Sequence, residues 1–173
     1  ESYFHWIAAH GRALMASALD GEVALRLVRD SIAVKVHVVG DDVREVGRRK
    51  ILNFGHTIGH AVEHLSGYAV LHGEAVAIGM VAEARLGELA DFTLPGLADD
   101  IRDLCVELGL PVSIDAAIDT DEIVELTRGD KKARSGAAEY ALPMRLGEMN
   151  DVDGRFSVPM QDALVREAIR SVR

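Results

Sequence analysis

The chain has 173 residues, of which 49% are hydrophobic and 27% are charged, and its formal net charge is −9. This length and composition fit one globular domain with a substantial core and exclude a disordered chain. The negative charge argues against nucleic acid or an anionic membrane surface as a partner. The sequence contains no apolar run of the roughly 20 residues that span a bilayer, and no signal-peptide pattern opens it.

The chain is expected to begin with two helices. Residues 2–19 predict one amphipathic helix, and after an Asp-Gly turn a second helix starts near Glu22. The tail of the second helix, 33–40 (AVKVHVVG), is ambiguous because its valines alternate with Lys35 and His37, as they would in a strand. Continuity with the preceding residues favours a helix here.

The stretch 49–74 is the most unusual part of the sequence, because it holds four of the seven histidines. A helix that begins with Asn53 at or near its N-cap places His56 and His60 on one side, since each residue advances by about 100°. Apolar residues such as Ile58 fall on the opposite side, which we expect to pack into the core.

A further histidine, His72, follows a glycine-containing turn and opens the next apolar helix. Two imidazoles from one helix and a third from the start of its neighbour can converge on a divalent cation. A His-x-x-x-His pair alone is more often part of a solvated helix face, so this alternative remains open. The glycines of the stretch favour close approach of the backbone to a ligand or another helix. We interpret His64 as structural.

The rest of the chain is predicted to be mostly helical. Residues 74–91 are apolar on nearly every side, which is typical of a helix in the centre of a bundle. The later elements, in chain order, are a helix over 97–108, a helix over 119–128 capped by Thr120 or Asp121, a β-hairpin formed by 139–149 and 155–159, and a terminal helix over 160–172.

Several hydrogen-bond donors accompany the histidines. Arg binds planar carboxylates through two parallel hydrogen bonds, whereas Lys acts as a point cation. Together with a cation, such donors indicate an anionic substrate, although composition alone favours a solvated surface for the RRK and DKK runs. The donors are Lys35, Arg49, Asn53, Lys131 and Lys132.

The string RKILNFGHTIGHAVE, followed by GY and LHGEAVAIGMV, resembles the 3-dehydroquinate synthase family of sugar phosphate cyclases. The resemblance runs from Tyr3 to the C-terminus. It implies a mainly α helical-bundle C-terminal domain over 1–173 with a small β-hairpin, and a separate N-terminal NAD-binding domain that is absent from this chain. It also favours a helix over 33–40. Because the sequence starts at Glu1 without Met, we interpret it as part of a longer protein.

The resemblance implies a role for each candidate residue. His56 and His72 match metal ligands, with Zn²⁺ or Co²⁺ as the metal and NAD bound mainly by the missing domain. His60 matches a substrate-binding and proton-transferring position. The other substrate-binding positions are Asn53 on the phosphate side and Lys35, Arg49 and Lys131 toward the carboxylate. The family's third metal ligand, a Glu, precedes this chain, and Glu1 does not match it by spacing. A catalytic zinc needs three protein ligands, so this polypeptide alone is predicted to be inactive.

The implied reaction is that of a carbon–oxygen lyase in the shikimate pathway of aromatic amino acid biosynthesis. It converts 3-deoxy-D-arabino-heptulosonate 7-phosphate to 3-dehydroquinate and phosphate. A cytoplasmic homodimer is expected, and the single Cys105 agrees with a reducing compartment. Two alternatives remain: a sister cyclase acting on sedoheptulose 7-phosphate, which lacks a carboxylate, and a non-catalytic helical module.

Overall fold

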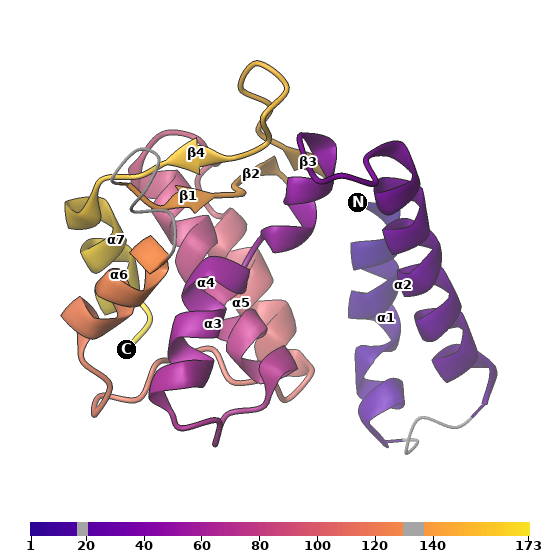
Figure 1. Cartoon of the computed structure of the whole chain (residues 1–173). Coiled ribbons are helices and arrows are strands. Elements are labelled where there is room, and N and C mark those ends of the chain that lie inside the picture. The colour runs from indigo at the N-terminus through magenta and orange to yellow at the C-terminus, as the bar shows by residue number, and fades with distance from the viewer. Residues whose placement is uncertain (17–20, 130–136) are drawn as a thin grey trace.

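The computed structural model describes residues 1–16, 21–129 and 137–173, and it confirms the mainly helical fold (Figure 1). The helices α1 (Ser2–Ala16) and α2 (Glu22–Asp41) lie side by side as a pair. The 3-10 helix η1 (Arg48–Asn53) leads from this pair to the rest of the fold. The remaining helices are α3 (His56–Leu65), α4 (His72–Leu89), α5 (Leu97–Glu107), α6 (Thr120–Arg128) and α7 (Asp162–Arg170). None of the described helices is both long and apolar enough to cross a membrane.

Helix α4 lies in the centre of the fold, as predicted from a sequence that is apolar on nearly every side until its last turns. It packs against α3, α5 and α7, and most of its residues between Ala75 and Gly87 are buried. A helix surrounded by others has no exposed face that would need polar residues. The largest buried apolar side chains of the core are Ile58, Val62, Val81, Leu86, Ile123, Val124, Tyr140, Leu142, Val165 and Ile169.

The ambiguous segment 33–40 is helical, as expected. Val38 is 4% exposed, whereas Val34 is 52% exposed and Val36 is 64% exposed. In a strand these three valines would point to the same face, whereas in a helix each two-residue step turns the side chain by about 200°. Val34 and Val38, four residues apart, therefore share one side of the helix while Val36 faces the other way, and of the three only Val38 is buried.

The start of the histidine helix differs from the prediction. Asn53 is the last residue of η1, and Gly55 is the N-cap of α3, with a positive φ of 81°. A left-handed backbone favours glycine because a side chain would be strained there. The interpretation of Asn53 as the cap is therefore wrong, and His56 becomes the first helical residue.

Helix α6 is also capped one residue earlier than predicted. The carboxylate of Asp119 accepts hydrogen bonds from the backbone N–H groups of Asp121 at 2.7 Å and Glu122 at 3.2 Å. Asp is a strong N-cap residue because its oxygen satisfies N–H groups that have no helical partner. Asp119, and neither Thr120 nor Asp121, therefore caps this helix.

The predicted β element is present but is divided into two small sheets. Strand β1 (Glu139–Tyr140) pairs antiparallel with β4 (Val158–Pro159), so the two predicted segments do meet. Between them, β2 (Pro143–Arg145) pairs with β3 (Glu148–Met149) around Gly147, whose φ is 82°. The single predicted hairpin is therefore wrong in detail, because this glycine turns the chain earlier.

Candidate metal centre

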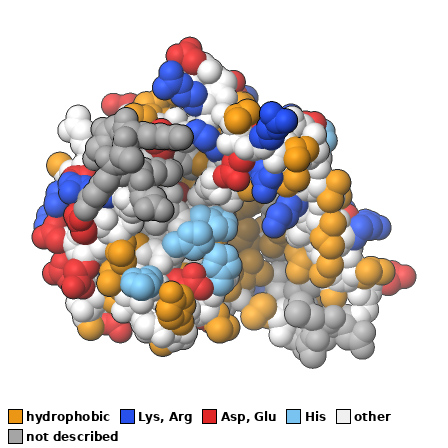
Figure 2. All heavy atoms as spheres, in the orientation of Figure 1, with side chains coloured by type: hydrophobic (Ala, Val, Ile, Leu, Met, Phe, Trp, Pro, Cys, Tyr) orange, Lys and Arg blue, Asp and Glu red, His pale blue; other side chains and the backbone are white. Residues whose placement is uncertain are grey.

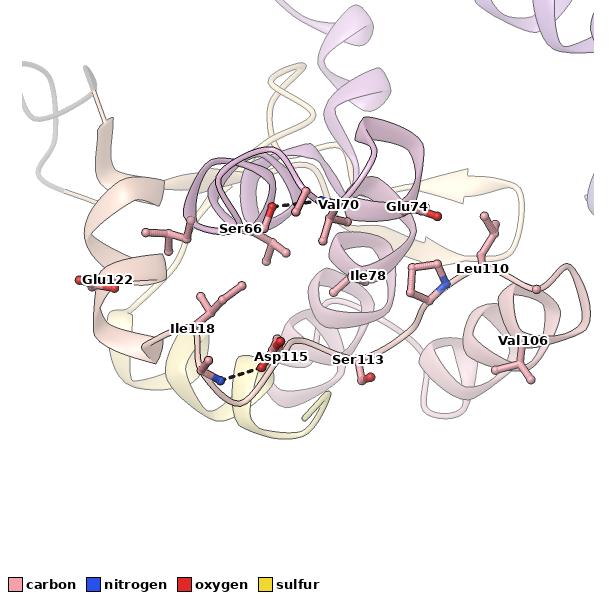
Figure 3. Close-up of a pocket in the computed structure, with 16 residues that line it drawn as sticks. Ser66, Val70, Glu74, Ile78, Val106, Leu110, Ser113, Asp115, Ile118 and Glu122 are labelled. Carbon is pink, nitrogen blue, oxygen red and sulfur yellow. Dashed lines mark hydrogen bonds between the residues drawn. The ribbon is translucent and has the colours of Figure 1, made fainter.

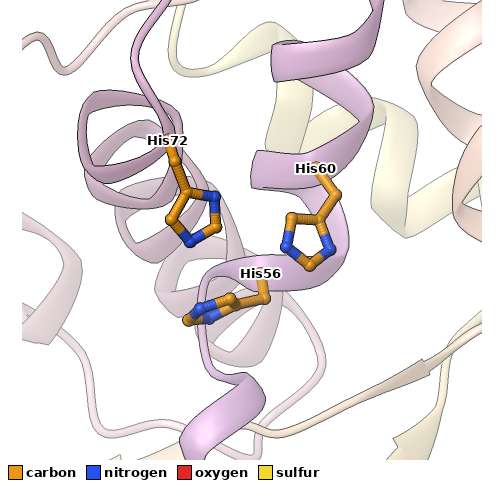
Figure 4. A group of neighbouring side chains, drawn as sticks. All are labelled: His56, His60 and His72. Atoms are coloured by element: carbon orange, nitrogen blue, oxygen red, sulfur yellow. The ribbon is translucent and has the colours of Figure 1, made fainter.

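Three imidazoles from two helices converge at one point on the surface (Figure 4). His56 and His60 lie on the first two turns of α3, and His72 is the first residue of α4. The ring centroids are 5.3 Å apart for His56 and His60, 5.5 Å for His56 and His72, and 5.4 Å for His60 and His72. One nitrogen from each ring lies within 4.8 Å of the others. In the part of the chain that is described, this is the one cluster of potential metal ligands.

Two of the three rings are held through their Nδ1 atoms. His56 Nδ1 lies 3.2 Å from the carbonyl oxygen of Phe54, and His72 Nδ1 lies 3.2 Å from Oε2 of Glu63. Carbonyl and carboxylate oxygens only accept hydrogen bonds, so each Nδ1 carries the proton in these contacts. The lone pair of a neutral ring is then on Nε2, where it can bind a metal. Partners of this kind commonly orient metal-binding histidines.

His60 completes the group but differs in its surroundings. Partial burial lowers the pKa of His60, and the neighbouring His56 and His72 lower it further, while Glu63 acts in the opposite direction. Among the described residues, none forms a hydrogen bond with its ring. His60 is therefore the imidazole of the group that is most free to reorient toward a ligand.

The cluster opens to solvent. His60 and His72 are exposed, and His56 is half-buried. Figure 2 shows the histidines beside a hollow with an apolar floor, and Lys and Arg side chains lie along its opposite edge. Imidazole nitrogens suit Zn²⁺ and Co²⁺. The donors present therefore fit such an ion.

The two predicted donors nearest the histidine helix share one carboxylate. Asn53 Nδ2 donates to Oε1 of Glu45 at 2.9 Å, and Arg49 Nε lies 3.7 Å from Oε2 of the same residue. Sequence reasoning did not single out Glu45. Glu45 precedes η1 and has a positive φ of 56°, so no helical spacing to Arg49 marks it in the sequence.

The connector before η1 is fixed by Asp42. Its carboxylate accepts hydrogen bonds from the backbone N–H groups of Gly47 at 2.8 Å, Arg49 at 3.1 Å and Val46 at 3.2 Å. These donors, that of Gly47 most strongly, lower the pKa of Asp42. Arg49 is thus held through its backbone N–H, by Asp42, as well as through its side chain.

The other predicted site residues are not joined to the cluster. Lys35 lies exposed on α2 and forms no hydrogen bond or ion pair among the described residues. Lys131 and Lys132 lie outside the described residues. Glu1 lies against Gly147, at the turn between β2 and β3. His64, interpreted as structural, lies outside the cluster, with Nδ1 3.3 Å from the Tyr68 hydroxyl.

A separate cavity of about 850 Å³ lies on the other side of α3 and is lined mainly by apolar residues (Figure 3). Two of its polar side chains have local partners. Ser66 Oγ donates to the carbonyl of Glu63 at 2.8 Å, and Asp115 Oδ1 accepts from the N–H of Ala117 at 2.8 Å. Among the described residues that line this cavity there is no His, Lys or Arg. We therefore assign metal and substrate binding to the histidine cluster.

Comparison with known protein families identifies this fold independently. Residues 1–133 match the model of the family described as 3-dehydroquinate synthase C-terminal. The curated 3-dehydroquinate synthase of a Synechococcus species is 39% identical over 148 residues, which cover 85% of this chain and 40% of that protein. The enzyme of the same name from Thermosynechococcus vestitus is 36% identical over 171 residues, which cover 98% of this chain and 45% of that protein. The chain thus spans less than half the length of these relatives.

Solved structures of two related enzymes share the fold. A 2-epi-5-epi-valiolone synthase from Streptomyces hygroscopicus, with NAD⁺ and Zn²⁺ bound, superposes with a TM-score of 0.79 at 20% identity and covers 98% of this chain and 45% of that one. A 2-deoxy-scyllo-inosose synthase, complexed with carbaglucose-6-phosphate, NAD⁺ and Co²⁺, gives a TM-score of 0.77 at 24% identity, over 87% of this chain and 41% of that one. At these identities the similarity establishes the architecture alone.

Proposed function

Because the chain belongs to the 3-dehydroquinate synthase C-terminal family, we propose that it forms the metal- and substrate-binding part of a 3-dehydroquinate synthase. The reaction would convert 3-deoxy-D-arabino-heptulosonate 7-phosphate to 3-dehydroquinate and phosphate. The observation that carries this proposal is the convergence of three imidazoles, two of which have their Nδ1 atoms bonded and their Nε2 atoms available.

His56 and His72 would hold the metal, Zn²⁺ or Co²⁺. When bound, the metal would polarise the substrate hydroxyl that NAD⁺ oxidises and would stabilise the developing negative charge. The Nδ1 contacts of both rings keep the imidazoles oriented before the metal arrives. A third protein ligand and the NAD⁺ site would lie outside this chain, so the chain alone would bind metal weakly and would not turn over substrate.

His60 would transfer protons near the substrate phosphate, because its ring lies beside the two metal-binding rings and has no hydrogen bond among the described residues. A neutral imidazole with a free nitrogen can accept a proton and return it. Arg49 would bind the substrate carboxylate, and Asn53 would donate to the phosphate. Lys35 and Lys131 would add positive charge.

The nature of the substrate is the second part of the proposal. A sister cyclase that acts on sedoheptulose 7-phosphate would need no guanidinium for a carboxylate. Arg49 is a planar donor held by a fixed turn, and this favours the substrate that carries a carboxylate.

Two measurements test the proposal. The first is calorimetric titration of the chain with Zn²⁺. Loss of a residue that orients a metal ligand typically weakens binding by roughly 10–100-fold, and we expect His56→Ala and His72→Ala each to weaken Zn²⁺ binding by more than this. Binding that is indifferent to both changes would favour a non-catalytic helical module. Turnover of the two sugar phosphates by the longest polypeptide that carries this sequence, with NAD⁺ and Zn²⁺ added, should occur only with the carboxylate-bearing one. Turnover of sedoheptulose 7-phosphate alone would refute the substrate assignment.

A further inference from the structure

A buried carboxylate from α4 holds the first turn of α3. Glu83 is 0% exposed, and its Oε2 accepts the N–H of Gly55 at 2.7 Å while its Oε1 accepts the N–H of Ile58 at 2.9 Å. Glu83 lies roughly three turns after His72 on the same helix. One side chain therefore joins the helix that carries His72 to the beginning of the helix that carries His56 and His60.

Glu83 supplies a cap that α3 cannot make for itself. The first N–H groups of a helix have no partner within the helix, and a side chain of the N-cap residue usually accepts from them. The N-cap of α3 is Gly55, which has no side chain. The carboxyl group of Glu83 takes over this role from a neighbouring helix.

The two helices approach closely enough for this contact because glycine lies on both. A side chain added at Gly79 of α4 would collide with the carbonyl oxygen of Gly55 and would lie 2.8 Å from the backbone nitrogen of Gly59. A side chain at Gly55 would lie 2.9 Å from the backbone nitrogen of Met80. The hydrogen bonds of Glu83 to the start of α3 therefore depend on the close packing of α3 and α4 at these glycines.

The environment of Glu83 is unusual for a carboxyl group. Burial raises the pKa of Glu83 to about 8, against the opposite effect of the N–H groups of Ile58, Gly55 and Thr57. No ion pair to Glu83 is present among the described residues. A buried carboxyl without a cation is costly, and its hydrogen bonds offset that cost only while α3 begins at its present residue.

We propose that Glu83 is a positioning residue of the metal centre, which fixes the start of α3 so that His56 and His60 face His72. A shift of the helix start by one residue would turn these side chains by about 100° and separate them from His72. Glu83 does not touch the rings. This inference rests on the proposed function, because it assumes that the cluster binds a metal.

The test is a titration of the whole chain with Co²⁺, followed by its visible absorption, for Glu83→Gln, Glu83→Asp and Thr93→Val. A Gln side chain has one oxygen and cannot accept both hydrogen bonds, whereas Asp keeps both oxygens on a shorter arm. Thr93→Val is the matched control: it removes the buried hydrogen bond from Thr93 Oγ1 to the carbonyl of Pro143, 2.6 Å long, against the far end of α4.

We expect Glu83→Gln to weaken Co²⁺ binding by about 10-fold or more, as outer-shell losses do, and Glu83→Asp to restore part of it. Thr93→Val should bind as the wild type does, even where its melting temperature falls as far as that of Glu83→Gln. A folded Glu83→Gln chain with unchanged Co²⁺ affinity and spectrum would overturn the positioning role alone. Failure of both Glu83 variants to fold would also overturn it, by assigning Glu83 to stability. Absence of Co²⁺ binding by the wild type would instead overturn the proposed function.

Discussion

Oε2 of Glu63 lies 3.2 Å from Nδ1 of His72, although Glu63 belongs to α3 and His72 opens α4. The contact closes the turn between the two helices with a carboxylate and an imidazole. It also sets the orientation of the ring, because the carboxylate accepts a hydrogen bond from the Nδ1–H and leaves Nε2 free. Glu63 would therefore contribute to the proposed metal centre without being one of its ligands.

Glu63→Gln should weaken Zn²⁺ binding by about 10–100-fold, the range seen when a metal-binding histidine loses its outer partner. The reason is that the amide holds the ring less firmly and no longer raises its basicity. Calorimetric titration of the chain with Zn²⁺ measures the effect. Glu122→Gln, at an exposed carboxylate on α6, is the control and should leave binding unchanged. Equal affinities for the Glu63 variant and the wild type would contradict the role.

Gly79→Ala should destabilise the fold by about 1–3 kcal/mol, the usual cost of overfilling a packed contact. The new methyl group would meet the backbone of Gly55 and Gly59 and push α3 from α4. Gly73→Ala on the same helix has open space, so it should be neutral or stabilise by up to about 1 kcal/mol. Urea unfolding of both variants measures the difference, and an equal effect of the two substitutions would refute the close contact.

The stability of the chain should depend on pH through Glu83. Its pKa is raised from 4.5 to about 8, so above pH 4.5 the folded chain keeps a proton that the unfolded chain releases. Stability from this group is complete below pH 4.5 and is lost as the pH rises through about 8. Glu83→Gln cannot titrate. Its melting temperature relative to the wild type should therefore rise with pH across this window, and a constant difference would contradict the expectation.

Arg49→Lys should raise the KM for 3-deoxy-D-arabino-heptulosonate 7-phosphate by about 10-fold or more, because a charged hydrogen-bond pair contributes roughly 1.5–3 kcal/mol. Arg48→Lys is the matched control. Arg48 is the preceding residue and pairs with Asp41 on the surface, with Nη1 2.6 Å from Oδ2, so its exchange should have little effect. Steady-state kinetics of the longest polypeptide with this sequence distinguishes them, and similar KM values for the two variants would argue against a carboxylate contact.

The elements of the fold follow from local patterns. The apolar period of residues 2–16, the apolar helix from His72 and the glycine after α5 are each encoded within a few residues, so the helices were predictable. The first residues of α3 and α6 were not predictable. Gly55 at the N-cap of α3 has no side chain and is capped from another helix, and Asp119 is followed by two further residues, Thr120 and Asp121, that could also cap α6. The β-hairpin was predicted too simply, since pairing of strands depends on where each chain segment lies in space.

The sequence by itself determined that His56 and His60 share one face of a helix and that His72 opens the next, because helical spacing is a property of neighbouring residues. Only the tertiary structure decided that His72 reaches the other two rings and that Glu63 accepts a hydrogen bond from its Nδ1–H. It also placed Glu83, the buried one of three glutamates in α4, against the start of α3. These contacts join separate helices. The distance between the helices is set by packing, here of glycine against backbone, and the periodicity of neighbouring residues does not encode that distance.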